Sequence, residues 1–299
     1  DAQLTSRRFG ALSRAIAAGK HLFTEKPTAE TLEDAIELAR LAKEKGITDG
    51  VVHDKLYLPG LVKLRQLVEN GFFGRIITMR GEFGYWVWEG TDVPTQRPSW
   101  NYRKEDGGGM TTDMFPHWNY VIEGIIGTIK TVYSQTATHI PERVDEKGNT
   151  YACTADDAAY AIFQVETPSG DQVIVELNSS WNVRVHRKEL VEFAVEGTQG
   201  SAVAGLRLCE TQSRAETPTP TWNPDLPDAN DYLSQWTDVS DTSLQNGFKL
   251  QWEEFLADVV AGRKHRYDLL SGARGVQLAE LGLQSSEEGR RLNVPEITL

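Results

Sequence analysis

Two side chains in the segment DGGGMTTDMFPHWNY, residues 106–120, have the types and the spacing of an acid–base pair. Asp113 and His117 are four residues apart, so they share one face if the segment is a helix. A carboxylate can orient an imidazole and favour its protonated form, which suits the histidine to general acid–base catalysis. An ordinary helical ion pair and a pair of metal ligands have the same spacing. No HExxH or comparable set accompanies it, and we expect no metal.

A lysine forms the second candidate group, in the tripeptide Glu25-Lys26-Pro27. It follows a short apolar run, residues 20–25, that reads as a buried strand. Ligands of open α/β sheets bind beyond the carboxyl ends of the strands, so Lys26 is predicted to reach the ligand crevice. The alternative is a surface lysine beside a helix start, where its charge is unfavourable. His53 closes the next strand and is expected on the same side.

Aromatic residues gather around the glycine run that precedes Asp113. The cluster consists of Tyr85, Trp86, Trp88, Trp100, Tyr102 and Trp118. Aromatic rings stack on the apolar faces of sugars, and indole N–H or phenol O–H groups donate to sugar hydroxyls. Packing in a core or at a subunit interface is the alternative for at least half of these residues.

The elements that position these groups begin as an alternation of helix and strand. Helices are predicted over 5–18 and 28–46, and strands over 20–25 and 47–54, with Gly19 and Gly46 ending the two helices. Such alternation is typical of a parallel sheet with helical crossovers. The N-terminus is therefore expected to be the last part of a doubly wound α/β unit.

The rest of the chain has the pattern of a mostly antiparallel sheet. Strands are predicted over 131–139, 158–166, 171–181, 190–197 and 201–208, where apolar residues alternate with polar ones. Residues 197–205 read as a hairpin. Helices are predicted over 58–71, 110–126, 248–262 and 269–290, and residues 211–246 as an extended surface excursion. Because one sheet face is open and apolar, we expect a homo-oligomer.

Composition and charge exclude several classes of partner. The net charge is −12, from 31 basic and 43 acidic residues, which argues against binding to nucleic acid or to an anionic membrane. No apolar run is long enough for a membrane span. The two cysteines, Cys153 and Cys209, form no CxxC, as expected for a reducing compartment, and we predict a cytoplasmic location.

Three segments together resemble the Gfo/Idh/MocA oxidoreductase family. They are AAGKHLFTEKP, VVHDKLYLPGLVKLRQLVENGFFGRI and GGGMTTDMFPHW, in the order and spacing of that family. The resemblance implies the C-terminal part of a Rossmann-type parallel sheet in residues 1–55. It further implies an α+β domain for substrate binding and oligomerisation in residues 56–299. Members of the family mostly oxidise or reduce a sugar or cyclitol carbon with NAD or NADP.

The resemblance also assigns roles to individual residues. Lys26 matches the lysine between nicotinamide and substrate, and His117 the proton acceptor or donor. Asp113 would orient His117 or bind a substrate hydroxyl. The remaining expected cofactor contacts are Glu25, Pro27 and His53, and the expected substrate contacts are Trp86, Tyr102, Arg103 and Trp118.

One departure from the family concerns the cofactor. The family begins with a strand, a GxGxxG loop and a helix, and this chain contains no such loop. We therefore expect a truncated or proteolysed form, and the alternative is that the missing half is a separate polypeptide. In either case the choice between NAD and NADP has no sequence marker. Two other functions remain open: a glycosidase or lyase that oxidises a sugar transiently, and a sugar-binding module without catalysis.

Overall fold

The N-terminal unit is a small α/β layer with two parallel strands. The computed structural model describes residues 1–220, 222–227, 229–239 and 245–299. Helix α1 (Thr5–Ala17), strand β1 (Leu22–Thr24), helix α2 (Leu32–Lys45) and strand β2 (Asp49–Val51) follow one another, and β1 pairs with β2 in parallel. This confirms the predicted alternation.

Local chemistry explains the bounds of α2. The Thr31 side chain accepts a hydrogen bond from the backbone N–H of Asp34, which satisfies one free donor at the helix start. Gly46, with φ of 68°, ends the helix in the left-handed conformation that glycine adopts without strain. The buried face of α2 carries Ala35, Leu38 and Ala42, which pack with the C-terminal helix α6 (Leu269–Glu288).

The second unit is built on a nine-stranded sheet among the described residues, with the order β12-β11-β10-β9-β3-β8-β7-β4-β13. Its strands in chain order are β3 (Ile76–Gly84), β4 (Thr128–Ala137), β7 (Ala158–Glu166), β8 (Gln172–Ser180), β9 (Val191–Gly197), β10 (Gly200–Ala204), β11 (Cys209–Ser213), β12 (Thr237–Asp238) and β13 (Leu292–Asn293). Only β3 and β8 pair in parallel among these strands, and the other described pairs are antiparallel. The predicted fold class is confirmed.

Two details of the predicted sheet differ from the structure. The strand expected over 201–208 ends at Ala204, and a separate strand begins at Cys209 because the chain turns back after Gly205. The hairpin expected over 197–205 is present as the β9–β10 pair. Strand β3, which had not been predicted, lies in the middle of the sheet. A further two-stranded ribbon is formed by β5 (Glu142–Val144) and β6 (Thr150–Ala152).

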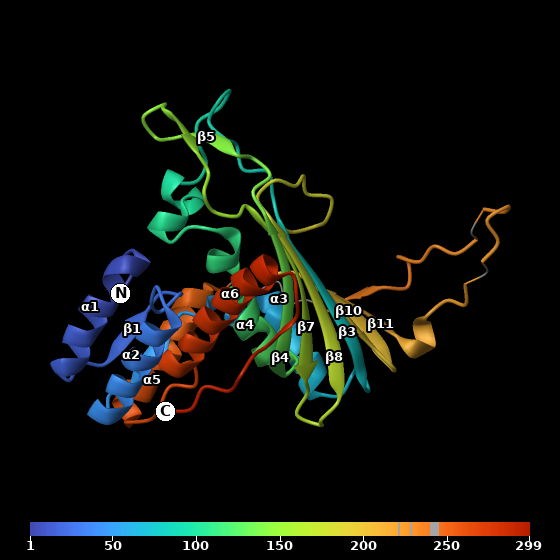
Figure 1. Ribbon diagram of the computed structural model, residues 1–299. Coiled ribbons are helices and arrows are strands. Elements are labelled where there is room, and N and C mark those ends of the chain that lie inside the picture. Colours follow the sequence, from blue (N-terminus) through green and yellow to red (C-terminus); the bar gives the residue numbers. More distant parts are fainter. Residues whose placement is uncertain (221, 228, 240–244) are drawn as a thin grey trace.

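Helices cover one face of the large sheet (Figure 1). Helix α4 (Met110–Ile125) is almost wholly buried between the sheet and α6, because apolar residues occur all round it. Helix α3 (Pro59–Glu69) and the short helix η1 (Asp54–Tyr57) connect the two units, and α5 (Gly247–Ala261) packs against η1. The expected domain boundary between residues 55 and 56 falls inside η1 and stays a prediction.

The segment after β11 leaves the body of the protein. It begins with the one-turn helix η4 (Arg214–Glu216) and continues as an extended chain that Figure 1 shows projecting from the sheet. The predicted excursion over 211–246 is therefore present in part, because residues 211–213 still belong to β11 and Thr237–Asp238 return to the sheet as β12. Residues 221, 228 and 240–244 lie outside the described residues. In the described part of the chain, no helix has the length and hydropathy to cross a membrane.

Candidate functional site

The start of α4 is fixed by a close approach between three backbone segments. A side chain at Gly108 would lie 2.3 Å from the Trp100 carbonyl oxygen, so only glycine fits there. Gly109, with φ of 130°, leads into the helix, and Asp156 accepts hydrogen bonds from the backbone N–H and the hydroxyl of Thr111. The glycine run thus lets the helix begin against the 98–103 loop, and this places Asp113 one turn inside it.

A cleft of about 300 Å³ opens between the end of β1 and the start of α4. Its walls include Glu25, Lys26 and Pro27 on one side, and Gly107–Gly109, Thr112 and Asp113 on the other. Trp100, Asn101, Asp106 and the N-terminal residues Ala2–Thr5 and Arg8 complete the lining. The cleft therefore lies where the carboxyl end of the parallel pair meets the second unit, as predicted for a ligand crevice.

Lys26 and Asp113 form an ion pair at this cleft. Lys26 Nζ donates to Asp113 Oδ1 over 2.6 Å and to the Asp113 carbonyl oxygen over 2.7 Å. Arg97 donates to the other carboxylate oxygen, Oδ2, over 2.9 Å. Burial opposes ionisation of Asp113, but the charges of Lys26 and Arg97 outweigh it and hold the pKa of this carboxyl below its ordinary value. The lysine is thus held at the cleft, 13% exposed, by an ionised partner.

His117 lies one turn further along α4 and has different partners. Its Nδ1 is 2.6 Å from the Tyr120 hydroxyl, and its Nε2 is 3.3 Å from Lys55 Nζ. Burial, together with the positive charges of Lys26 and Lys55, holds the pKa of His117 well below its ordinary value. The imidazole is therefore neutral and able to accept a proton.

The expected orientation of His117 by Asp113 is not what the structure shows. Among the hydrogen bonds of the described residues, none joins these two side chains, because Asp113 faces two cations and His117 faces Tyr120 and Lys55. The helical spacing brings both groups to the same region but does not make them partners. On α4 itself, His117 is hydrogen-bonded to Tyr120, three residues further along the helix.

The expected cofactor contacts divide into two groups. Glu25, Lys26 and Pro27 line the cleft, and the peptide bond between Lys26 and Pro27 is cis. His53 does not line it. Its ring is buried behind Tyr120, with centroids 4.2 Å apart, and burial lowers the pKa of His53 to about 3. His53 follows β2 directly, but the chain turns there into η1 and the ring faces the interior.

The four expected substrate contacts are placed away from the cleft walls. Tyr102 and Trp118 are buried in the main core, where Tyr102 packs on Trp181 and the Trp118 N–H donates to Ser179. The packing alternative therefore holds for these two residues. Arg103 stacks over Tyr151, and Trp86 lies under Arg184. Of the six residues of the aromatic cluster, Trp100 lines the cleft.

Arg97, Lys55 and Tyr120 were missed by the sequence analysis. Arg97 lies over the Trp181 ring at 4.3 Å and also donates to Asn101 and to the Tyr85 hydroxyl. Nothing in the irregular segment 89–98 marks it. Lys55 and Tyr120 had a weak signal, since each lies within three residues of a histidine that the sequence had singled out.

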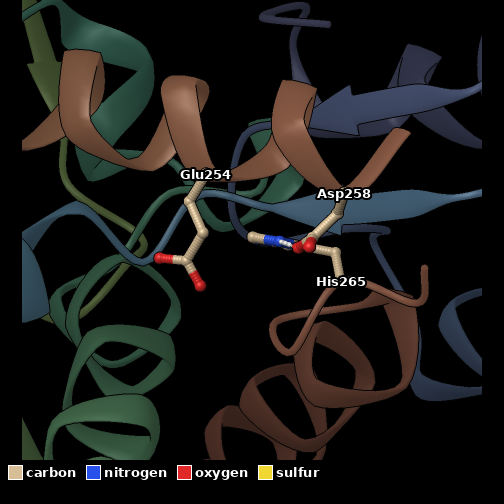
Figure 2. Close-up of side chains that lie close together, drawn as sticks. All are labelled: Glu254, Asp258 and His265. Atoms are coloured by element: carbon tan, nitrogen blue, oxygen red, sulfur yellow. Dashed lines mark hydrogen bonds and ion pairs between the residues drawn. The ribbon is translucent and has the colours of Figure 1, made fainter. Parts of the chain in front are cut away.

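The described residues include one group of three side chains with the donor atoms for a metal, Glu254, Asp258 and His265 (Figure 2). Each of them already has protein partners. His265 Nδ1 lies 2.9 Å from Asp258, Arg263 donates to the same carboxylate, and Tyr57 donates to Glu254 over 2.6 Å. The group ties α5 to the segment that leads into α6, and we assign it a structural role.

Known proteins resemble this chain in sequence and in fold. Residues 61–203 match the Gfo/Idh/MocA C-terminal domain, and residues 7–53 match the oxidoreductase family with an NAD-binding Rossmann fold. D-xylose dehydrogenase of Paenarthrobacter nicotinovorans is 68% identical over 100% of this chain and 77% of its own length. Levoglucosan dehydrogenase of Pseudarthrobacter phenanthrenivorans is 26% identical over 63% of this chain and 50% of its own length.

The solved structures agree on the fold. Levoglucosan dehydrogenase in its apo form superposes with a TM-score of 0.81 at 19% identity, over 99% of this chain and 79% of the other. The same enzyme in complex with NADH and levoglucosan gives a TM-score of 0.78 over 99% and 79%. Because the sequence identity is only 19%, this likeness establishes the fold alone.

Proposed function

The chain belongs to the Gfo/Idh/MocA oxidoreductase family, and from this premise we propose that it is an NAD-dependent dehydrogenase of D-xylose or a closely related aldose. Family membership confirms the resemblance predicted from the sequence, and with it the expected class of nicotinamide-dependent sugar oxidoreductase. The proposed substrate rests on the 68% identity with a D-xylose dehydrogenase across the whole chain. The proposed cofactor rests on the matched NAD-binding fold and on the NADH complexes of levoglucosan dehydrogenase.

The observation that carries the proposal is the Lys26–Asp113 pair at the mouth of the cleft, with neutral His117 one turn beyond it. The cleft fits the nicotinamide end of the cofactor, because it lies at the carboxyl ends of β1 and β2 and is walled by Glu25, Lys26 and Pro27. The phosphate-binding loop of the family has no counterpart in this sequence. We therefore propose that these residues bind only the nicotinamide end of the cofactor.

Lys26 and Asp113 in the cleft wall, and His117 behind it, supply the other parts of the reaction. Glu25, Lys26 and Pro27 would hold the nicotinamide, which would supply the hydride acceptor for the hydroxyl-bearing carbon of the sugar. Lys26, held by Asp113, places a fixed positive charge where the sugar oxygen becomes negative. His117 is uncharged and accepts the hydroxyl proton. Asp113 restrains Lys26, and Arg97 restrains Asp113.

A kinetic assay tests this function. The full-length protein is mixed with NAD⁺ or NADP⁺ and with D-xylose, and formation of the reduced nicotinamide is followed by its absorbance. We expect D-xylose-dependent reduction with NAD⁺ and a much slower rate with NADP⁺. Absence of any sugar-dependent reduction with either cofactor contradicts the proposal.

The same assay separates the alternative of transient oxidation. A 2,7-anhydro-N-acetylneuraminate hydratase of Escherichia coli is 27% identical over 61% of this chain and 44% of its own length, so a reaction without net redox change exists among the relatives. A reaction of this type would consume the sugar without accumulation of reduced cofactor. Equal amounts of oxidised sugar and reduced nicotinamide are the result that we expect.

We further propose a homo-oligomer that buries the open face of the sheet. Tyr133 and Ile162 are cross-strand neighbours on this face, and Ile174 is two residues along the adjacent strand; they are 38%, 47% and 48% exposed. An apolar patch of this kind is typical of an interface. Light scattering during gel filtration tests it, with Ile162→Lys predicted to dissociate the oligomer. The predicted cytoplasmic location stays a prediction.

A further inference from the structure

Four polar side chains behind the cleft form a closed network, and His117 is the one member of it that the proposed reaction uses. Lys55 Nζ lies 3.3 Å from His117 Nε2, and His117 Nδ1 lies 2.6 Å from the Tyr120 hydroxyl. The Tyr120 hydroxyl lies 3.3 Å from Asp54 Oδ1, and Lys55 Nζ lies 3.7 Å from the same oxygen. The network joins α4 to η1, the short helix that follows β2.

Burial lowers the pKa of Lys55, and Asp54 beside it favours the charged form. With Lys55 charged and Asp54 ionised, the direction of every hydrogen bond in the network is fixed. An ammonium group only donates and an ionised carboxylate only accepts. His117 Nε2 is therefore the acceptor from Lys55, and the single proton of the neutral imidazole is on Nδ1. His117 Nδ1 then donates to the Tyr120 oxygen, and the Tyr120 hydroxyl donates to Asp54.

Burial makes His117 a poor final holder of a proton. Its side chain is 7% exposed, and Lys26 and Lys55 both place positive charge near the ring. An imidazolium ion there would be a further cation beside Lys26 and Lys55 in a desolvated region, while Asp113 is already paired with Lys26 and Arg97. Asp54, by contrast, is 14% exposed at the side chain, so its carboxylate reaches the solvent.

We infer that Tyr120 and Asp54 form a proton relay, which carries the proton of the substrate hydroxyl away from His117. This inference rests on the proposed sugar oxidation. The substrate hydroxyl takes the place of Lys55 at Nε2 and gives its proton to that nitrogen. The Nδ1 proton passes to the Tyr120 oxygen as the Tyr120 hydroxyl proton passes to the Asp54 carboxylate. One hydroxyl O–H bond breaks and one carboxyl O–H bond forms, while the electron pair leaves the sugar carbon with the hydride.

Tyr120 and Asp54 are positioning and relay residues, since they act on the substrate only through His117. Lys55 has a separate role in the network. It holds Nε2 as an acceptor in the resting protein, so that the tautomer with Nδ1 protonated is present before the sugar arrives. The Tyr120 ring is itself held by stacking on His53, which Tyr120→Phe preserves.

Three variants of the full-length protein test the relay: Tyr120→Phe, Asp54→Asn and the double variant. We expect kcat for sugar oxidation to fall by about 10- to 100-fold in each single variant, because one proton-transfer step is lost. KM for the sugar should be unchanged. The double variant should be no slower than the singles, since both remove the same step. Tyr57→Phe is the matched control, because its hydroxyl binds Glu254 outside the network, and it should keep the parent kcat.

A proton inventory in mixtures of light and heavy water gives the specific signature. The parent protein should show a curved dependence, from several protons in motion, and Tyr120→Phe a linear one. A parent kcat in Tyr120→Phe, or multiplicative losses in the double variant, would overturn the relay. If His117→Gln loses activity while Tyr120→Phe and Asp54→Asn keep it, His117 is the final proton acceptor. The proposed function then stands without the relay.

A second readout does not depend on activity. Magnetic resonance of the parent protein with isotope-labelled histidine should place the His117 proton on Nδ1. A proton on Nε2 would contradict the network whatever the reaction. Failure of the proposed function is recognised separately, as absence of sugar-dependent nicotinamide reduction in the parent protein.

Discussion

Among the described residues, two clusters combine a carboxylate, a histidine and neighbouring cations, and they differ in access. In the first, on α4, Asp113 and His117 have no direct bond, and Asp113 faces a cleft together with Lys26. In the second, Asp258 and His265 are bonded directly over 2.9 Å. His265 is fully buried, and its ring contacts those of Phe23 and Phe255.

The contrast shows that composition alone does not make an active site. By residue type the second cluster is the better acid–base pair, since its carboxylate touches its imidazole. However, it is closed by aromatic rings and by Arg263, so no substrate reaches it. The first cluster keeps its carboxylate and its histidine apart, which leaves a cation at the cleft and an uncharged base behind it. Substitutions in the two clusters should therefore differ in effect: those at the Asp113–His117 cluster should lower activity, and those at the Asp258–His265 cluster should lower stability.

The largest effect is expected for Lys26→Ala. Removal of the fixed charge beside the reacting oxygen should lower kcat by about 100- to 1000-fold, as for other preorganised charges in enzyme sites. The matched control is Lys264→Ala, because Lys264 also pairs with an aspartate but its side chain is 75% exposed. Steady-state rates of both variants give the comparison. Similar rates for the two variants would remove the distinction between the clusters.

The second prediction compares the same substitution at the two histidines, His117 and His265. His117→Gln should lower kcat by about 100-fold, because a proton acceptor is lost. His265→Gln should leave kcat of the folded protein intact but lower the free energy of unfolding by about 1–3 kcal/mol, because the buried Asp258 loses a partner. Urea denaturation and steady-state kinetics measure both quantities. A loss of activity without a loss of stability in His265→Gln would contradict its structural role.

Much of this architecture could be predicted from the sequence, and the omissions have physical causes. Helices α2, α4 and α6 have recognisable ends, such as Gly46 after α2 and the glycine run before α4, so their positions were correct within a few residues. Strand β3 was missed because its buried positions do not alternate strictly. Residues such as Lys26 and Asp113 are marked by local motifs. Arg97 is not, because its position depends on an irregular loop folding back onto α4.

The same reasoning explains the error over Tyr102 and Trp118. A tryptophan beside a catalytic motif fits both sugar binding and core packing, and sequence gives no measure of depth. In the structure both side chains face the interior of the sheet and helix layers and are at most 1% exposed. For Trp118, side-chain direction on α4 decides between these roles, and a shift of one residue rotates it by about 100°.

A third prediction concerns Arg97, which links the reactive cluster to its loop. Arg97→Met should raise KM for the sugar and lower kcat/KM by about tenfold, a loss of about 1.4 kcal/mol, because Asp113 keeps one cation instead of two. Arg187→Met is a control on the sheet, where Arg187 pairs with Glu82 away from the cleft. An unchanged kcat/KM in Arg97→Met would show that Lys26 alone holds Asp113.

The smallest effect is a change in the pH dependence of stability. His53 has its pKa lowered to about 3 by burial, so in the folded protein it stays neutral while the unfolded chain takes up a proton below its ordinary pKa. Its contribution to stability is thus present above about pH 6.5 and is lost as the pH falls, by about 1.4 kcal/mol per pH unit. His53→Phe should reduce the loss of stability between about pH 7 and pH 5. An unchanged slope in urea denaturation would contradict this burial effect.

The central claim is that the cleft between β1 and α4 is where a sugar is oxidised. The most direct measurement is a single turnover of the full-length protein with NAD⁺ and D-xylose, followed by the absorbance of reduced nicotinamide. We predict a burst of reduced cofactor in the parent protein and in His265→Gln, and its loss in Lys26→Ala and His117→Gln. A burst of parent size in both Lys26→Ala and His117→Gln would contradict the claim.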